Sequence, residues 1–111
     1  MDPMIIGTTV PFVNSTAFDM YSAWLPRQGN AVRLSAEILT ASPVKLTVQT
    51  KNRAEVETDA ADLGNSTGTG TVSVRVTGVK ELVRYKVTTN PGQEMWDEIE
   101  HIRLLDPQWE R

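Results

Sequence analysis

The amino-acid sequence predicts an all-β protein, an antiparallel β-sandwich of about eight strands that is jelly-roll-like in outline. Two observations predict this fold. Apolar and polar residues alternate with a period of two in four separate segments, and residues typical of turns bound these segments. The length of 111 residues fits one domain with one core, and helix content is expected to be near zero.

The alternation is clearest where Val72, Val74 and Val76 alternate with Ser73 and Arg75. Successive side chains of a β-strand point to opposite faces, so this pattern is typical of a strand with one buried face. Branched and aromatic residues, which favour strands, supply most of the apolar positions. Four strands are predicted in this way, over residues 31–38, 44–49, 72–77 and 83–88.

The connections between these predicted strands are short. Residues 41–43 and 77–80 separate consecutive strands closely enough that each pair is expected to form a hairpin. Residues 54–63 are expected to form an irregular strand or a loop. The polar, glycine-rich segment 65–70 is expected to be a loop.

Both ends of the chain are predicted to lie outside the main sandwich. Residues 1–14 are expected to form an N-terminal arm or an edge strand, because Pro11 has no N–H to donate within a central strand. Residues 15–105 are the predicted sandwich domain, and residues 106–111 are a predicted C-terminal tail. The last predicted strand, 95–105, breaks the alternation, which a β-bulge would explain.

Composition argues against several classes of partner. The net charge is −3, from 11 basic and 14 acidic residues without a basic cluster, so nucleic acid is not an expected partner. No apolar run approaches the ~20 residues that cross a bilayer, so membrane contact is not expected. There is no cysteine, and therefore no disulfide or thiolate metal site.

No catalytic residue, metal ligand or cofactor site is predicted, and the chain is not expected to be an enzyme. His101 is the single histidine, and its neighbours on the same strand face, Ile99 and Arg103, include neither an acid nor a nucleophile. Glu98 and Glu100 belong to an acidic segment that is expected to be a solvated face. A hydrolase with these carboxylates as acid and base is the weakest alternative.

The tryptophans are the main candidates for binding. Trp24 and Trp96 lie near predicted strand ends, where each packs into the core or rim or stacks on a sugar ring. Trp109 lies near the C-terminal end of the chain, where a monomer buries it with difficulty, so it is a candidate anchor for a partner. The other candidate contacts are apolar residues of the N-terminal arm: Met4, Ile5 and Ile6.

The order of several segments resembles that of short β-sandwich virion proteins of tailed bacteriophages and prophages, of the capsid decoration (cement) type. These segments are Tyr21-Ser22-Ala23-Trp24-Leu25, Val32-Arg33-Leu34, Ser42-Pro43, Leu46-Thr47-Val48-Gln49-Thr50 and Arg84-Tyr85-Lys86-Val87. The resemblance covers roughly residues 15–105. The chain departs from the group at Glu55-Val56-Glu57-Thr58, where a strand with a tryptophan often stands.

The resemblance implies a structural protein of the virion, made in the cytoplasm of a host bacterium. Its implied partner is the major capsid protein, and it is expected to form a small homo-oligomer, with a trimer favoured. The N-terminal arm and Trp109 would make the contacts. The alternative is a carbohydrate-binding module of a phage tail or a bacterial surface assembly, with Trp24 or Trp96 as the stacking platform.

Overall fold

The computed structural model describes residues 9–16, 19–39, 43–89 and 102–110. These residues form strands almost throughout, with one 3-10 turn at Glu57–Asp59 and no α-helix among them. The all-β prediction is therefore confirmed. The strands are β1 (Thr9–Val10), β2 (Phe12–Ser15), β3 (Asp19–Ser22), β4 (Leu25–Pro26), β5 (Ala31–Ile38), β6 (Val44–Lys51), β7 (Ala61–Gly68), β8 (Gly70–Thr77), β9 (Leu82–Thr89), β10 (Ile102–Leu105) and β11 (Gln108–Glu110).

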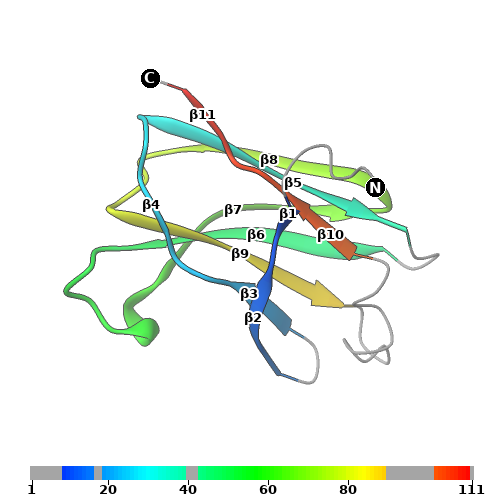
Figure 1. The fold of residues 1–111 in the computed structure, drawn as a ribbon, viewed down its shortest axis with the longest axis horizontal. Helices are drawn as coiled ribbons and strands as arrows, with labels where there is room; N and C mark the ends of the chain where they lie inside the picture. The colour runs from blue at the N-terminus through cyan, green and yellow to red at the C-terminus, as the bar shows by residue number, and fades with distance from the viewer. Residues whose placement is uncertain (1–8, 17–18, 40–42, 90–101, 111) are drawn as a thin grey trace.

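The strands form two antiparallel sheets (Figure 1). In the first sheet β1, β10, β5 and β8 are neighbours in that order, and β11 also pairs with β5. In the second sheet the order is β2, β3, β9, β6 and β7, and β4 also pairs with β9. Since β8 pairs with β5 along its whole length, β10 and β11 share the other edge of β5.

This arrangement is a β-sandwich that is jelly-roll-like in its strand order. Three strands are interrupted, because β1 is followed directly by β2, β3 by β4, and β10 by β11. Merging these three pairs reduces the eleven segments to eight strands, of which strand 1 passes from the first sheet (β1) to the second (β2). The order is 1-8-3-6 in the first sheet and 1-2-7-4-5 in the second. Eight antiparallel strands in two sheets joined as Greek keys define the jelly roll.

The two predicted hairpins are wrong. Strand β5 lies in the first sheet and β6 in the second, and β8 and β9 are divided in the same way. Alternation shows which side chains face inward, but it does not show in which sheet a strand lies. A short connection spans either the ~5 Å between paired strands or the ~10 Å between stacked sheets. The predicted loop at residues 65–70 is also wrong, because β7 extends to Gly68 and pairs with β6.

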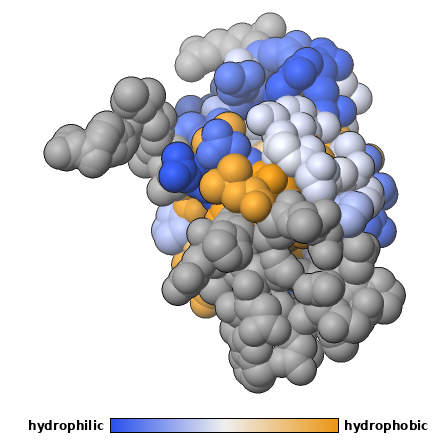
Figure 2. Space-filling model, turned by 90° about the vertical axis from the view of Figure 1, so that its right-hand side faces the viewer, coloured by the Kyte–Doolittle hydropathy of each residue, from blue (hydrophilic) through white to orange (hydrophobic). Residues whose placement is uncertain are grey.

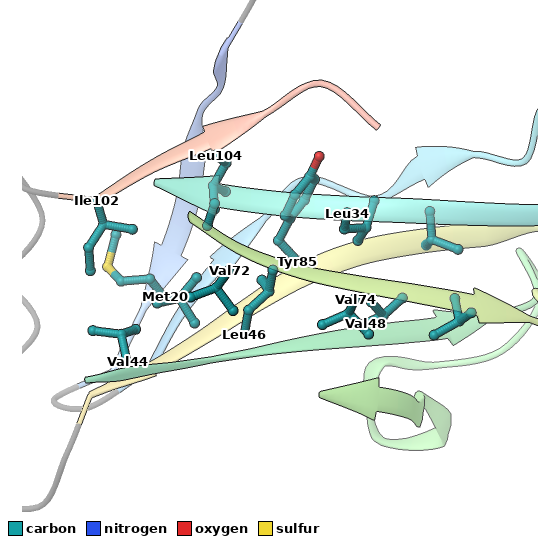
Figure 3. Packing of buried hydrophobic residues seen from close by; sticks show 14 of the residues in the cluster. Met20, Leu34, Val44, Leu46, Val48, Val72, Val74, Tyr85, Ile102 and Leu104 are labelled. Carbon is teal, nitrogen blue, oxygen red and sulfur yellow. The ribbon is translucent and has the colours of Figure 1, made fainter. Parts of the chain in front are cut away.

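The core lies between the two sheets and consists mainly of valine and leucine (Figure 3). Leu34 and Val74 from the first sheet meet Leu46 and Val48 from the second. Tyr85 is fully buried among them and donates a hydrogen bond from its hydroxyl group to a backbone carbonyl oxygen of β10. Burial raises the pKa of the Tyr85 hydroxyl, so this donor stays protonated.

The segment predicted as a C-terminal tail contains β11, which runs along β5. Trp109 is partly buried there and packs against the core. The Glu110 carbonyl oxygen accepts a 2.8 Å hydrogen bond from the Asn30 N–H. The Glu110 carboxylate accepts two hydrogen bonds from Arg75. A Cβ on Gly29 would overlap that same carbonyl oxygen, so only glycine leaves room for β11.

Several candidate residues lie outside the described residues, namely Met4, Ile5, Ile6, Trp96, Glu98, Glu100 and His101. Of the last predicted strand, the structure describes only β10.

Where the structure describes the chain, it holds no helix long and apolar enough to cross a membrane. Figure 2 faces the side of the molecule on the right of Figure 1, where an apolar area lies next to hydrophilic residues.

Candidate functional site

The clearest concentration of functional side chains lies on the outer face of the second sheet. The alternation that buries Val83 and Tyr85 of β9 turns Arg84 outward. The register places Arg84 opposite Gln49 of β6, and Gln49 opposite Asp62 of β7. We call the following group of side chains the Arg84 cluster: Tyr21, Trp24, Gln49, Lys51, Glu57 and Arg84.

A break in the sheet places Trp24 beside β9. Strand β3 ends at Ser22 and β4 begins at Leu25, and both pair with β9. At this break the buried Ser22 hydroxyl accepts a 2.9 Å hydrogen bond from the Tyr85 N–H, replacing the missing backbone acceptor. The same hydroxyl donates a 3.0 Å hydrogen bond to the Ala23 carbonyl oxygen. The interruption is thus stabilised by one side chain, and Trp24 lies within it.

Arg84 is in contact with two aromatic rings. Its guanidinium carbon is 4.4 Å from the centre of the Tyr21 ring and 4.3 Å from that of the Trp24 ring. A guanidinium at this distance is attracted by the negative face of an aromatic ring. These contacts and those with its neighbours leave Arg84 only 8% exposed, although it is on the outer face of a sheet. Arg84 is the central residue of the cluster.

Hydrogen bonds fix the orientation of the guanidinium group. Arg84 Nε donates to Gln49 Oε1 over 2.8 Å, and Gln49 Nε2 donates to Asp62 Oδ1 over 2.9 Å. The chain of contacts thus crosses β9, β6 and β7. A charged side chain this deeply buried is stable only when it is paired and hydrogen-bonded, and both conditions are met here.

Glu57 closes the cluster from the solvent side. One carboxylate oxygen accepts a 2.7 Å hydrogen bond from Trp24 Nε1, and the other accepts a 2.7 Å hydrogen bond from Arg84 Nη1. The hydrogen bond from Trp24, together with the charges of Arg84 and Lys51, lowers the pKa of Glu57. The carboxylate is therefore held in its charged form.

Glu57 belongs to the segment that connects β6 and β7 (Figure 1). Hydrogen bonds within this segment hold Glu57 against the cluster. Lys51 Nζ donates to the Glu55 carbonyl oxygen over 2.9 Å, and the Asp59 carboxylate accepts from the Val56 N–H over 3.2 Å. Glu57 itself belongs to the 3-10 turn. Residues 54–63 were predicted as an irregular strand or a loop. The structure has a loop with the 3-10 turn up to residue 60, and Ala61 begins the regular strand β7.

Lysine side chains extend the cluster on two sides. The ammonium nitrogen of Lys51 lies 5.2 Å from the centre of the Trp24 ring, and that of Lys86 lies 6.0 Å from the centre of the Tyr21 ring. Two cations therefore lie over the Trp24 ring, namely Arg84 and Lys51. The cluster presents aromatic and cationic groups together, with one carboxylate bridging them.

Of the residues predicted for binding, the structure places only Trp24 in this cluster. Trp109 is on β11 of the first sheet, away from it, and the other predicted contact residues lie outside the described residues. Sequence reasoning missed Arg84 and Glu57. The alternation of Arg84 with Val83 and Tyr85 indicates that Arg84 is on the outer face of β9, and this could have made it a candidate. No pattern in the loop indicated Glu57.

The cluster is suited to recognition. Its groups are a guanidinium, an ammonium, an indole, a phenol, an amide and a carboxylate. All of them except the phenol take part in the hydrogen bonds described above. Within the described ranges no three Asp, Glu or His side chains converge on a point that would hold a metal ion. Comparisons with protein-family models, with curated proteins and with solved structures each find no match.

Proposed function

We propose that this chain is a non-catalytic structural protein of a bacteriophage virion, which decorates or cements the capsid through protein–protein contacts. The observation that carries the proposal is the contact of Arg84 with both Tyr21 and Trp24 on the outer face of a jelly roll. Tryptophan, tyrosine and arginine are the residue types that contribute most to protein–protein binding. Jelly rolls occur in viral capsids, and the segment resemblance points to the same class.

The rigidity of the cluster supports a role in tight association. Arg84 is oriented by Gln49, and Trp24 by its hydrogen bond to Glu57. Side chains already ordered in the free protein lose little conformational entropy when a partner binds, so more of the contact energy appears as affinity. A flexible arginine on an open strand would not have this advantage.

The same geometry favours a protein partner over a glycan. A sugar ring stacks on an open aromatic face, but two cations already lie over the Trp24 ring, and its indole N–H is bonded to Glu57. A glycan would have to displace charged groups before it could stack. The carbohydrate-binding alternative with Trp24 is therefore second, and Trp96 lies outside the described residues.

Decoration acts by adding contacts that have to be lost before a shell opens. Stable protein–protein contacts bury ~1,200–2,000 Å² in total, and repetition over a symmetric shell multiplies a modest affinity. A homotrimer placed where capsid subunits meet would present three copies of the cluster to the major capsid protein.

Cryo-electron microscopy of particles from the source of the gene tests the proposal. Density for the jelly roll at symmetric positions on the shell is expected, and a shell without it would contradict decoration. In co-sedimentation with such particles, Trp24→Ala should weaken binding at least about tenfold. The matched control is Arg103→Ala on the first sheet, where the side chain is 56% exposed. Trp24-dependent binding to a glycan array would support the second function instead.

A further inference from the structure

The geometry points to a carboxylate-binding site formed by Trp24, Arg84 and Lys51, which the chain fills with its own Glu57. In this site an aspartate or glutamate side chain of the partner protein replaces Glu57 when the two proteins associate. The existence of the site depends only on the cluster, whereas the identity of the partner rests on the proposed function.

Two donors of the site match the two oxygens of one carboxylate. Trp24 Nε1 and Arg84 Nη1 each donate over 2.7 Å, and each reaches a different oxygen of the same group. Lys51 adds a positive charge that contributes to the lowered pKa of the bound carboxylate. Paired donors with a nearby cation are the arrangement by which proteins recognise carboxylates.

The receiving half of the site is rigid. The Arg84 side chain is 10% exposed, in contact with two rings, and hydrogen-bonded to Gln49. Trp24 lies within the break that the buried Ser22 hydroxyl stabilises. Arg84 therefore belongs to the sheet, and its contact with the Trp24 ring does not involve Glu57. Both donors are expected to keep their positions when the group that fills the site leaves.

The group that fills the site is attached differently. The Glu57 side chain is 60% exposed and belongs to a 3-10 turn with no buried residue. Its neighbour Val56 is 61% exposed. Displacement of this turn would therefore move no core side chain. This asymmetry between a buried cation and an exposed carboxylate distinguishes the site from an ion pair that stabilises only the fold.

Glu57 acts as a tethered competitor. A group held by a short segment of chain has an effective concentration in the millimolar range, so a free carboxylate competes poorly in the wild-type protein. A partner protein overcomes this competition because it adds contacts around the site. Removal of the Glu57 carboxylate should make the site accessible to small carboxylates as well.

A titration with acetate tests the inference, with the Trp24 indole N–H signal as the NMR readout. Trp24→Phe identifies that signal, and sodium chloride keeps the ionic strength constant. In Glu57→Ala, acetate should move the signal towards its wild-type position, with affinity at least about tenfold higher than in the wild-type protein. The matched control is Glu37→Ala, which removes an exposed carboxylate from the outer face of the first sheet and should behave as the wild type.

Glu57→Gln provides a second variant that keeps the length of the side chain, and it should also bind acetate more tightly than the wild type. The inference is wrong if acetate leaves the Trp24 signal unchanged in both variants, or if all variants bind acetate equally. A stronger response to inorganic phosphate than to acetate would overturn the carboxylate assignment. If the variants bind acetate but virions show no density for this protein, the proposed function is refuted and the carboxylate site stands. If virions show the density but neither variant binds acetate, the carboxylate site is refuted and the proposed function stands.

Discussion

The guanidinium carbon of Arg84 lies 4.3 Å from the centre of the Trp24 indole ring, and both groups bind the Glu57 carboxylate. Three parts of the chain meet in this contact: a strand, a break between strands, and a loop. The relationship makes Arg84 important for stability as well as for recognition, and the two roles lead to separate measurements.

Arg84→Lys should destabilise the fold by about 1–2 kcal/mol, because lysine has neither the planar group nor the fork of donors that contacts two rings and binds Gln49. Urea unfolding followed by far-ultraviolet circular dichroism measures this change. Arg75→Lys is the matched control, because the Arg75 side chain is 47% exposed. Its effect should stay within about 0.5 kcal/mol. Equal losses in both variants would contradict the importance of the ring contacts.

Glu57→Gln should change how stability depends on pH. The folded protein lowers the pKa of Glu57 below its ordinary value of 4.5, so the charged form favours folding. This stabilisation is present above that value and is lost as the pH falls through the lowered pKa of the folded state. The stability difference between wild type and variant should be largest near neutral pH and should shrink as the pH falls below 4.5. A stability difference that stays constant over this pH range would refute the lowered pKa of Glu57 in the folded protein.

Gly29→Ala should loosen β11 from β5, because the added methyl group overlaps the Glu110 carbonyl oxygen. The Asn30 N–H donates a hydrogen bond to that oxygen over 2.8 Å. This N–H should exchange with deuterium faster in the variant. Gly68→Ala is the control, since its Cβ would meet only a Val72 methyl group at 3.8 Å. Unchanged exchange at Asn30 in Gly29→Ala would show that this close approach is not needed.

The sandwich could be predicted from local pattern because each strand carries its own signal. Val32 and Leu34 of β5, like Val83 and Val87 of β9, are fully buried at the positions that alternation assigned to the core. Side-chain direction in a strand is a property of the backbone, and it needs no knowledge of the neighbouring strands. The same pattern had no information on whether β5 pairs with β6, which is why the hairpin predictions were wrong.

The site was less predictable than the fold. Trp24 drew notice as a tryptophan near a strand end, but its partners depend on register across the second sheet and on the conformation of a loop. Arg84 reaches Gln49 only because β9 and β6 pair in one register, and a shift of one residue would turn Arg84 into the core. Glu57 belongs to a segment without periodicity.

The sequence by itself determined an all-β sandwich, the faces of its four clearest strands and most of its core, because alternation of side chains is local to each strand. Only the tertiary structure decided the assignment of strands to sheets and the meeting of Trp24, Arg84 and Glu57. The physical reason is that these relationships depend on pairing between segments distant in the chain. Pairing is selected by the packing of the whole core, which no single segment encodes.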